Sequence, residues 1–290
     1  MKKYLLIAFL GLVTHMIALE LPSSNDPFGL LATNENLDAL SKELTMPPIL
    51  KHGQVPVLNP GGGYAIIFLD PISRAFVDYC KTCQYPVLDV GAGYGTITLA
   101  VLKETSCSII ANDIGVENLL VLRKGAEKST LSRLFLNSNR FPNALDFPKN
   151  SLGGIAICQV LHFLTGNEID LGLKKIYDWL MPGGKLFIVT CSPFVKSLIA
   201  FMPTYEERVK NKERWPGQIE DYASLCPEMP NLPLFFHVMD HKVMQEALKR
   251  AGFEIEKLTF VDRRATIPSI GLDGKESIGI VAVKLLNQNN

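Results

Sequence analysis

One short stretch constrains the fold more than any other part of the chain. Residues 87–90 form a short buried strand by their pattern, residues 96–102 begin a helix, and glycines stand at positions 91, 93 and 95 between them. Glycine lacks a Cβ atom and tolerates positive φ angles, so its backbone can lie close to a ligand. The stretch therefore predicts a strand–turn–helix unit with a ligand at the turn, although an ordinary βα loop has a similar composition.

The position of the acidic residue narrows the kind of ligand. A dinucleotide site has the pattern G-x-G-x-x-G, in which the helix N-terminus binds a pyrophosphate. Here the pattern is D-x-G-x-G-x-G, with Asp89 two residues before the first glycine. A carboxylate at this place repels a pyrophosphate and attracts an amino group. The pattern resembles the first motif of the class I S-adenosylmethionine-dependent methyltransferases, and the resemblance covers residues 84–191, with a fainter likeness over 238–286.

This resemblance implies a fold, a cofactor and an activity. The fold would be α/β, with a seven-stranded, mostly parallel Rossmann-like sheet, helices on both faces, an N-terminal extension and a lid insertion. The cofactor would be S-adenosyl-L-methionine, whose methyl group would pass to a small-molecule, lipid or protein acceptor. Two alternatives stay open. One is a non-catalytic protein that binds S-adenosylmethionine or acts as an effector, and the other is an NAD-dependent Rossmann oxidoreductase, which the glycine spacing disfavours.

The remaining elements follow the order that this family shows. The expected strands cover residues 87–90, 107–111, 134–138, 154–158, 185–190, 253–261 and 278–283. An amphipathic helix is predicted over residues 167–180, and Met-Pro-Gly-Gly at 181–184 should end it before the fifth strand. Asp70 followed by proline predicts the N-terminus of a helix that reaches residue 83.

The candidate cofactor residues lie at or directly after the ends of the first four strands. They are Asp89, Gly91, Ala92, Gly93, Gly95, Asp113, Ile114, Asn139, Arg140, Gln159 and Val160. Asp113 follows Asp89 by 24 positions (113 − 89), and a carboxylate there can accept hydrogen bonds from ribose hydroxyls or cap the next helix. Asn139 stands where the family often has the aspartate that contacts adenine, so we expect its amide to take that contact.

The candidate catalytic residue is His162, which follows the fourth strand; His237, His241, Tyr64 and Tyr205 are the other possible bases. A sulfonium is already a strong electrophile, so a base is needed only when the acceptor arrives protonated. A structural histidine is the alternative interpretation. The family's N-P-P-Y motif for amine acceptors is absent after this strand. No metal is expected, because the C-x-x-C at Cys80 and Cys83 has no second pair.

Charge limits the partners. Lys and Arg together number 29, as do Asp and Glu, and no basic run occurs. Nothing here indicates electrostatic capture of a nucleic acid, and membrane contact is expected only through the N-terminal leader.

Three parts of the chain are predicted. Residues 1–19, a basic start followed by an apolar run, resemble a signal peptide; a buried helix and an uncleaved anchor are the alternatives. Such a leader favours a secreted or periplasmic location over a cytoplasmic or membrane-anchored one. Residues 20–83 form a helical extension and residues 84–286 the methyltransferase domain. Within it, the proline- and aromatic-rich residues 192–237 are interpreted as a lid, or else as a scaffold or dimer surface.

Overall fold

A computed structural model describes residues 19–58, 63–225 and 233–286. The predicted signal-like leader, apart from residue 19, lies outside these residues and stays a prediction. Within the described ranges, no helix has both the length and the apolar character needed to cross a membrane.

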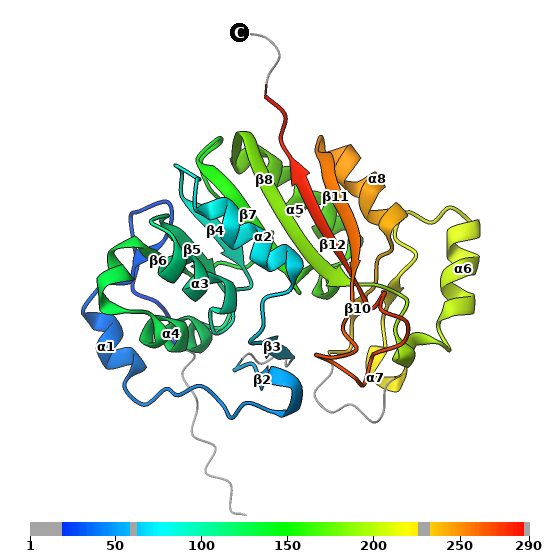
Figure 1. The fold of residues 1–290 in the computed structure, drawn as a ribbon, viewed down its shortest axis with the longest axis horizontal. Helices are drawn as coiled ribbons and strands as arrows, with labels where there is room; N and C mark the ends of the chain where they lie inside the picture. The colour runs from blue at the N-terminus through cyan, green and yellow to red at the C-terminus, as the bar shows by residue number, and fades with distance from the viewer. Residues whose placement is uncertain (1–18, 59–62, 226–232, 287–290) are drawn as a thin grey trace, which may run out of the picture.

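The centre of the molecule is one eight-stranded sheet with the strand order β1-β6-β5-β4-β7-β8-β12-β11 (Figure 1). Strands β6, β5, β4, β7 and β8 are parallel, while β1, β12 and β11 are antiparallel to their neighbours. The bounds are β1 Leu30–Leu31, β4 Val87–Val90, β5 Ile109–Asn112, β6 Leu134–Asn137, β7 Leu152–Cys158, β8 Leu180–Cys191, β11 Glu254–Val261 and β12 Ser277–Val283.

This sheet confirms the predicted α/β fold, with one strand more than the seven expected. The extra strand is β1, a two-residue segment of the N-terminal extension that pairs with the edge strand β6 through Leu30 and Leu136. Two residues are too few to show the alternation of apolar and polar side chains from which strands are recognised, so this strand could not be predicted from the pattern.

Helices cover both faces of the sheet because its central strands are apolar on both sides. In β4, Leu88 and Val90 belong to one apolar cluster, which includes α5 (Gly166–Trp179) and α8 (His241–Ala251). Val87 belongs to the cluster on the other face, which includes α2 (Pro71–Cys80), α3 (Thr96–Glu104) and α4 (Val116–Gly125). Buried parallel strands of this kind have near-continuous apolar sequences.

Side-chain caps determine where several helices begin. The Asp70 side chain accepts hydrogen bonds from the N–H groups of Ile72 and Ser73 at the start of α2, as the sequence predicted. Thr165 and Glu168 form a capping box at the start of α5. The capped turn before α2 matters for the site, because Asp70 also faces the cavity described below.

The N-terminal extension contains less helix than expected. It holds α1 (Asn36–Ser41), the 3₁₀ turn Lys51–Gly53, and the hairpin of β2 (Gln54–Pro56) and β3 (Tyr64–Ile66). The hairpin is tied to the glycine-rich turn: the Tyr94 hydroxyl donates to the carbonyl of Pro56 at 2.7 Å, and the Thr96 hydroxyl to that of Ile66 at 2.8 Å. The extension therefore lies over the carboxyl end of β4.

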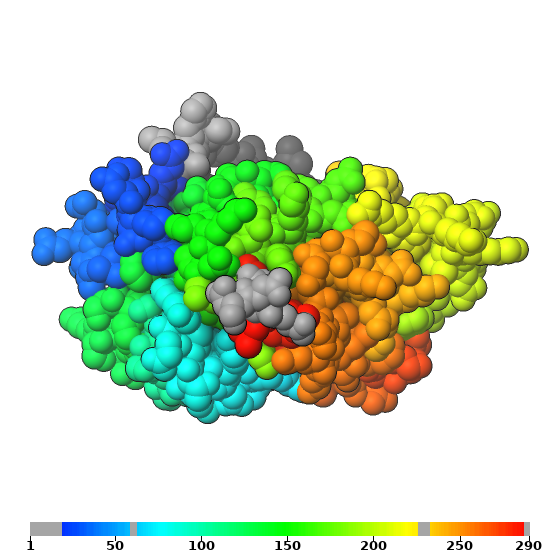
Figure 2. All heavy atoms as spheres, turned by 90° about the horizontal axis from the view of Figure 1, so that it is seen from above, coloured from blue at the N-terminus to red at the C-terminus, as the bar shows by residue number. Residues whose placement is uncertain are grey.

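Residues 192–237 form a small unit beside the end of β8, which Figure 2 shows in yellow at one end of the molecule. Its elements are the 3₁₀ turn Lys196–Leu198, α6 (Met202–Lys210), β9 (Gln218–Ile219), α7 (Tyr222–Leu225) and β10 (Phe236–His237). Its apolar side chains make a cluster of their own, among them Leu198, Tyr205 and Tyr222. Asp170 of α5 anchors the unit by binding Arg214 at 3.0 Å and the Trp215 indole N–H at 3.2 Å.

Candidate functional site

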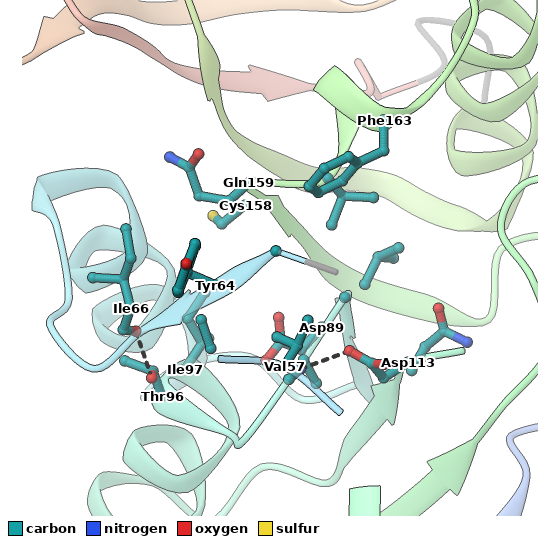
Figure 3. A pocket seen from close by; sticks show the side chains of 18 of the residues that line it. Val57, Tyr64, Ile66, Asp89, Thr96, Ile97, Asp113, Cys158, Gln159 and Phe163 are labelled. Carbon is teal, nitrogen blue, oxygen red and sulfur yellow. Dashed lines mark hydrogen bonds between the residues drawn. The ribbon is translucent and has the colours of Figure 1, made fainter. Parts of the chain in front are cut away.

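A cavity of about 410 Å³ lies at the carboxyl ends of β4, β5 and β7, roofed by the β2–β3 hairpin (Figure 3). Ligands of open parallel sheets bind at this edge, where the chain connections leave a central strand in opposite directions. Nine of the eleven predicted cofactor residues line the cavity: Asp89, Gly91, Ala92, Gly93, Asp113, Ile114, Arg140, Gln159 and Val160.

Gly95 and Asn139 are not among the lining residues. Gly95 has φ +89° and precedes α3, and a Cβ atom there would come within 2.6 Å of Leu122 Cγ, so this glycine allows α3 to pack closely on α4. Asn139 is exposed, and its backbone N–H donates to the Asn137 side chain at 3.0 Å. In this conformation neither residue faces the space that a ligand would fill.

The first turn of the motif is held against the neighbouring loop. Gly91 has φ +74°, and a Cβ atom there would lie 2.2 Å from Val160 Cγ2. The N–H groups of Gly91 and Ala92 both donate to the carbonyl of Asn112 at 2.8 Å. Only glycine adopts this φ without strain while its backbone touches a neighbouring side chain, so the turn is rigid and its shape depends on the glycine.

Asp113 connects the ends of two strands. One carboxylate oxygen accepts from the Gly93 N–H at 2.9 Å, and the other accepts from the Gly115 N–H at 2.8 Å and the Asn118 amide at 3.1 Å. The residue is buried and lines the cavity. The side chain predicted to bind ribose hydroxyls thus also fixes the glycine-rich turn, whereas the N-cap of α4 is Gly115 and no side chain caps that helix.

Asp89 is the most perturbed carboxyl group of the site. Its side chain is 2 % exposed, and Oδ2 accepts a hydrogen bond from the Thr98 hydroxyl at 2.8 Å. The pKa of Asp89 is raised to about 7, mainly by burial; the Thr98 hydrogen bond lowers it, and the negative charge of Asp113 adds to the rise. A cationic partner in the cavity would favour the ionised form, so the surroundings of Asp89 suit an ammonium group.

Gln159 has an unusual conformation. It has φ +62°, its backbone N–H donates to the carbonyl of Val189 at 2.7 Å, and it lines the cavity. Its side-chain Nε2 atom is buried and has no hydrogen-bond partner among the described residues. Strained backbone and an unsatisfied buried donor are both costly, and they tend to occur where a ligand supplies the missing contact.

His162, the predicted base, does not line the cavity. Its ring packs between Phe163 and Phe236, with centroid distances of 4.2 Å and 4.9 Å. Burial lowers the pKa of His162 to about 3, with a smaller effect from the positive charge of Arg263. The histidine is therefore neutral and buried in the aromatic packing, as the structural alternative anticipated, and its catalytic role stays a prediction.

Sequence reasoning missed several residues of the cavity wall. Phe68 comes from the N-terminal extension, Phe235 from the 192–237 segment and Arg263 from the turn after β11, whereas Tyr64, which also lines the cavity, was among the possible bases. Arg263 forms a buried ion pair with Asp70 at 3.0 Å, across 193 positions of sequence. The aspartate was visible as a helix cap, but nothing in the local pattern marks the arginine as part of the same site.

Among the described residues, the cysteines are not part of any metal site. Cys80, Cys83, Cys107, Cys158 and Cys191 are free thiols. Across the described ranges, no group of three or more histidine, cysteine, aspartate or glutamate side chains is arranged to hold a metal ion.

Comparisons with known proteins identify the fold. Residues 87–184 match a family model described as a methyltransferase domain. The chain has the fold of the class I S-adenosylmethionine-dependent methyltransferases. The matched segment runs from β4 into the start of β8 and carries every predicted cofactor residue. A search of curated proteins gave no match.

Solved structures agree on the fold at low sequence identity. A SAM-dependent methyltransferase of Methanosarcina mazei is 20% identical with a TM-score of 0.55, and the alignment covers 76% of this chain and 99% of that one. An S-adenosylmethionine-dependent methyltransferase of Mesorhizobium loti is 16% identical, with a TM-score of 0.52 and coverages of 73% and 97%.

A third solved structure is the 1,6-didemethyltoxoflavin-N1-methyltransferase of Burkholderia thailandensis, which contains S-adenosylhomocysteine. It is 15% identical, with a TM-score of 0.51 and coverages of 74% and 77%. Together with the domain match, these structures support S-adenosylmethionine as the cofactor of this chain.

The residues present fit that cofactor. The cavity has the size of a small-molecule pocket. The carboxyl group of Asp89 suits an ammonium, and the buried carboxylate of Asp113 suits hydroxyl donors. A Cβ atom at residue 91 would collide with Val160. Because Gly91 has no side chain, the backbone of the turn at this position is exposed to the cavity.

Proposed function

We propose that this chain transfers the methyl group of S-adenosylmethionine to an acceptor that enters the same cavity. The main support for this proposal is that Asp89, the glycine-rich turn and Asp113 converge on one cavity at the carboxyl edge of a parallel sheet. They come from two different strands, β4 and β5, so an accidental tight turn does not account for the arrangement.

Bound S-adenosylmethionine would supply an electrophilic methyl group to the acceptor and would leave as S-adenosylhomocysteine, with the electron pair of the former carbon–sulfur bond on sulfur. The chain's contribution would be binding, orientation and exclusion of water. Asp89 and Asp113 would hold the two polar ends of the cofactor. Phe163, Phe235 and Tyr64 line the cavity from three other segments and would keep water from the reacting groups. A protonated acceptor must lose its proton during the reaction.

We also propose that residues 84–286 form the methyltransferase domain, that residues 20–83 are its N-terminal extension, and that residues 192–237 cover the acceptor. Pro233 and Phe235 support the last assignment, because they bring the 192–237 segment into the cavity wall.

The test is binding followed by turnover. Calorimetric titration of the full-length protein with S-adenosylmethionine, S-adenosylhomocysteine and NADH should give heat only for the first two. Incubation of the protein with labelled cofactor and cell extract should then release S-adenosylhomocysteine and label an acceptor. Binding of NADH instead would favour the oxidoreductase alternative. Cofactor binding without any turnover would favour the non-catalytic one.

A further inference from the structure

The proposed function leaves two hydrogen-bond donors of the cavity without a role. We propose that these donors, on Arg263 and Gln159, bind a carboxylate group of the methyl acceptor, and that the acceptor is an apolar carboxylic acid. This inference rests on the proposed function and names its substrate class.

Arg263 is held rigidly at the cavity wall. Its side chain is 3 % exposed, its Nε–H donates to the Ser277 hydroxyl at 3.3 Å, and its Nη2 donates to Asp70 at 3.0 Å. Its backbone N–H donates to Glu276 at 2.9 Å. Nη1 makes no hydrogen bond within the part of the chain that the structure describes. One arm of the guanidinium is therefore available in a position fixed by the others.

Asp70 does not use up the binding capacity of this arginine. The Oδ1 atom of Asp70 already accepts the N–H groups of Ile72 and Ser73, and only Oδ2 is bonded to Arg263. A guanidinium has five N–H groups in one plane, and a carboxylate binds two of them side by side. A second carboxylate can therefore approach the free arm in the same plane.

Gln159 supplies the second donor. The Gln159 Oε1 atom accepts from the Cys191 thiol at 3.8 Å, so its Nε2 points away from that thiol, and Nε2 is the buried donor without a partner described above. Cys191 is paired in register with Ser277, the partner of the Arg263 Nε–H. The two donors thus flank one point of the sheet, where β8 ends beside the start of β12.

The positions of the two donors indicate that they bind the acceptor and not the cofactor. Asp113 follows β5, on one side of β4, whereas Gln159 follows β7, on the other side, and Arg263 follows β11 at the far edge of the sheet. Figure 3 shows Gln159 and Cys158 on the opposite side of Asp89 from Asp113. A cofactor held by Asp89 and Asp113 would leave the end of the cavity near β7 and β12 to the acceptor.

The lining between the donors and the opening is mainly apolar. The cavity wall includes Phe163, Leu164, Pro233 and Phe235, together with Phe68 from the extension. Phe68 and Phe163 are exposed, at 51% and 40%. Apolar walls that end in two donors select a ligand with an apolar body and an anionic head. The cofactor's own carboxylate shares this chemistry, so the experiment must separate the two sources.

The probe pair is trans-cinnamate and its amide, which have the same shape and differ in charge. Each is titrated by calorimetry into full-length protein saturated with S-adenosylhomocysteine. We expect cinnamate to bind about tenfold or more tightly than cinnamamide, as for a charge-assisted pair. The Arg263→Gln variant should lose this preference. If that variant does not fold, Arg263→Lys takes its place and should keep part of the preference. Arg264→Gln is the matched control, because Arg264 is exposed and binds only Asp262.

The titration of S-adenosylhomocysteine into the same variants distinguishes the sources. Unchanged affinity in Arg263→Gln, with the cinnamate preference lost, supports an acceptor site. A loss of about tenfold in S-adenosylhomocysteine affinity would mean that Arg263 binds the cofactor carboxylate, and equal binding of both probes to the unaltered protein would mean that no acid site exists. Either result overturns the inference and leaves the proposed function standing. Absence of S-adenosylhomocysteine binding in the unaltered protein would overturn the proposed function itself.

Discussion

Replacement of Asp89 by Asn should stabilise the protein and weaken cofactor binding at the same time. The carboxyl group is buried, and its pKa of about 7 lies well above the ordinary value of 3.8. Asparagine has nearly the same shape and can still accept the Thr98 hydrogen bond through its carbonyl oxygen. The substitution therefore removes mainly the charge.

The stability effect depends on pH in a defined direction. Because the folded protein holds the Asp89 proton more tightly than the unfolded chain, this group's contribution to stability is complete below pH 4 and is lost as pH rises toward 7. The loss amounts to at most ~4 kcal/mol when both states are ionised, from the difference between the two pKa values. Asp89→Asn should show no such loss. Its unfolding free energy should match that of the unaltered protein near pH 4 and exceed it at pH 8.

The binding effect has the opposite sign. An ammonium group needs the ionised carboxylate, whose fraction at a pKa of about 7 rises about fivefold between pH 6 and pH 7. Calorimetric affinity for S-adenosylhomocysteine should rise by a similar factor in the unaltered protein. In Asp89→Asn it should be about tenfold weaker at pH 7 and nearly independent of pH. A variant that binds as tightly as the unaltered protein, or that is less stable at pH 8, would refute this reasoning.

Two further substitutions test the site in other ways. Gly91→Ala places a Cβ atom 2.2 Å from Val160 Cγ2 at a φ of +74°, so we expect a loss of about 1–2 kcal/mol of stability or more and at least tenfold weaker cofactor binding, measured by thermal unfolding and calorimetry. His162→Phe keeps the ring among its aromatic neighbours, and because His162 is away from the cavity wall we expect the rate of methyl transfer to stay within about twofold and the pH–rate profile to keep its shape. A rate loss of a hundredfold in that variant would restore His162 as the base.

Much of the fold could be predicted because it is local. Residues 87–90 and 96–104 have the predicted secondary structure, since apolar runs and glycines act over a few positions. The observed elements differ from the predicted ones where tertiary contacts determine the secondary structure. The Pro-Gly-Gly of residues 182–184 was expected to separate a helix from a strand, but it lies inside β8, where the pairing with β7 shifts register between Leu152 and Gly154. The last long helix begins at His241 because the Asp240 side chain caps it, a start that depends on one side-chain hydrogen bond.

The same distinction applies to the cavity. Asp89 lies within β4, and Asp113 and Gln159 directly follow β5 and β7, so strand order alone brings them to one edge. Arg263 and Asp70 meet only because β12 and β11 return beside β8 and α2 packs across them, which no short-range pattern encodes. Residues that meet through such distant pairings can be found only once the fold is known.

The hydrogen bonds from the glycine-rich turn to the β2–β3 hairpin have a practical consequence for where the protein can be cut. A fragment that starts at residue 84 would contain the whole matched domain but would lack the acceptors of the Tyr94 and Thr96 hydroxyls, the roof at Tyr64 and the partner of Arg263. We therefore expect the smallest working fragment to be larger than residues 87–184, which match the domain model, and to include the β2–β3 hairpin and Asp70.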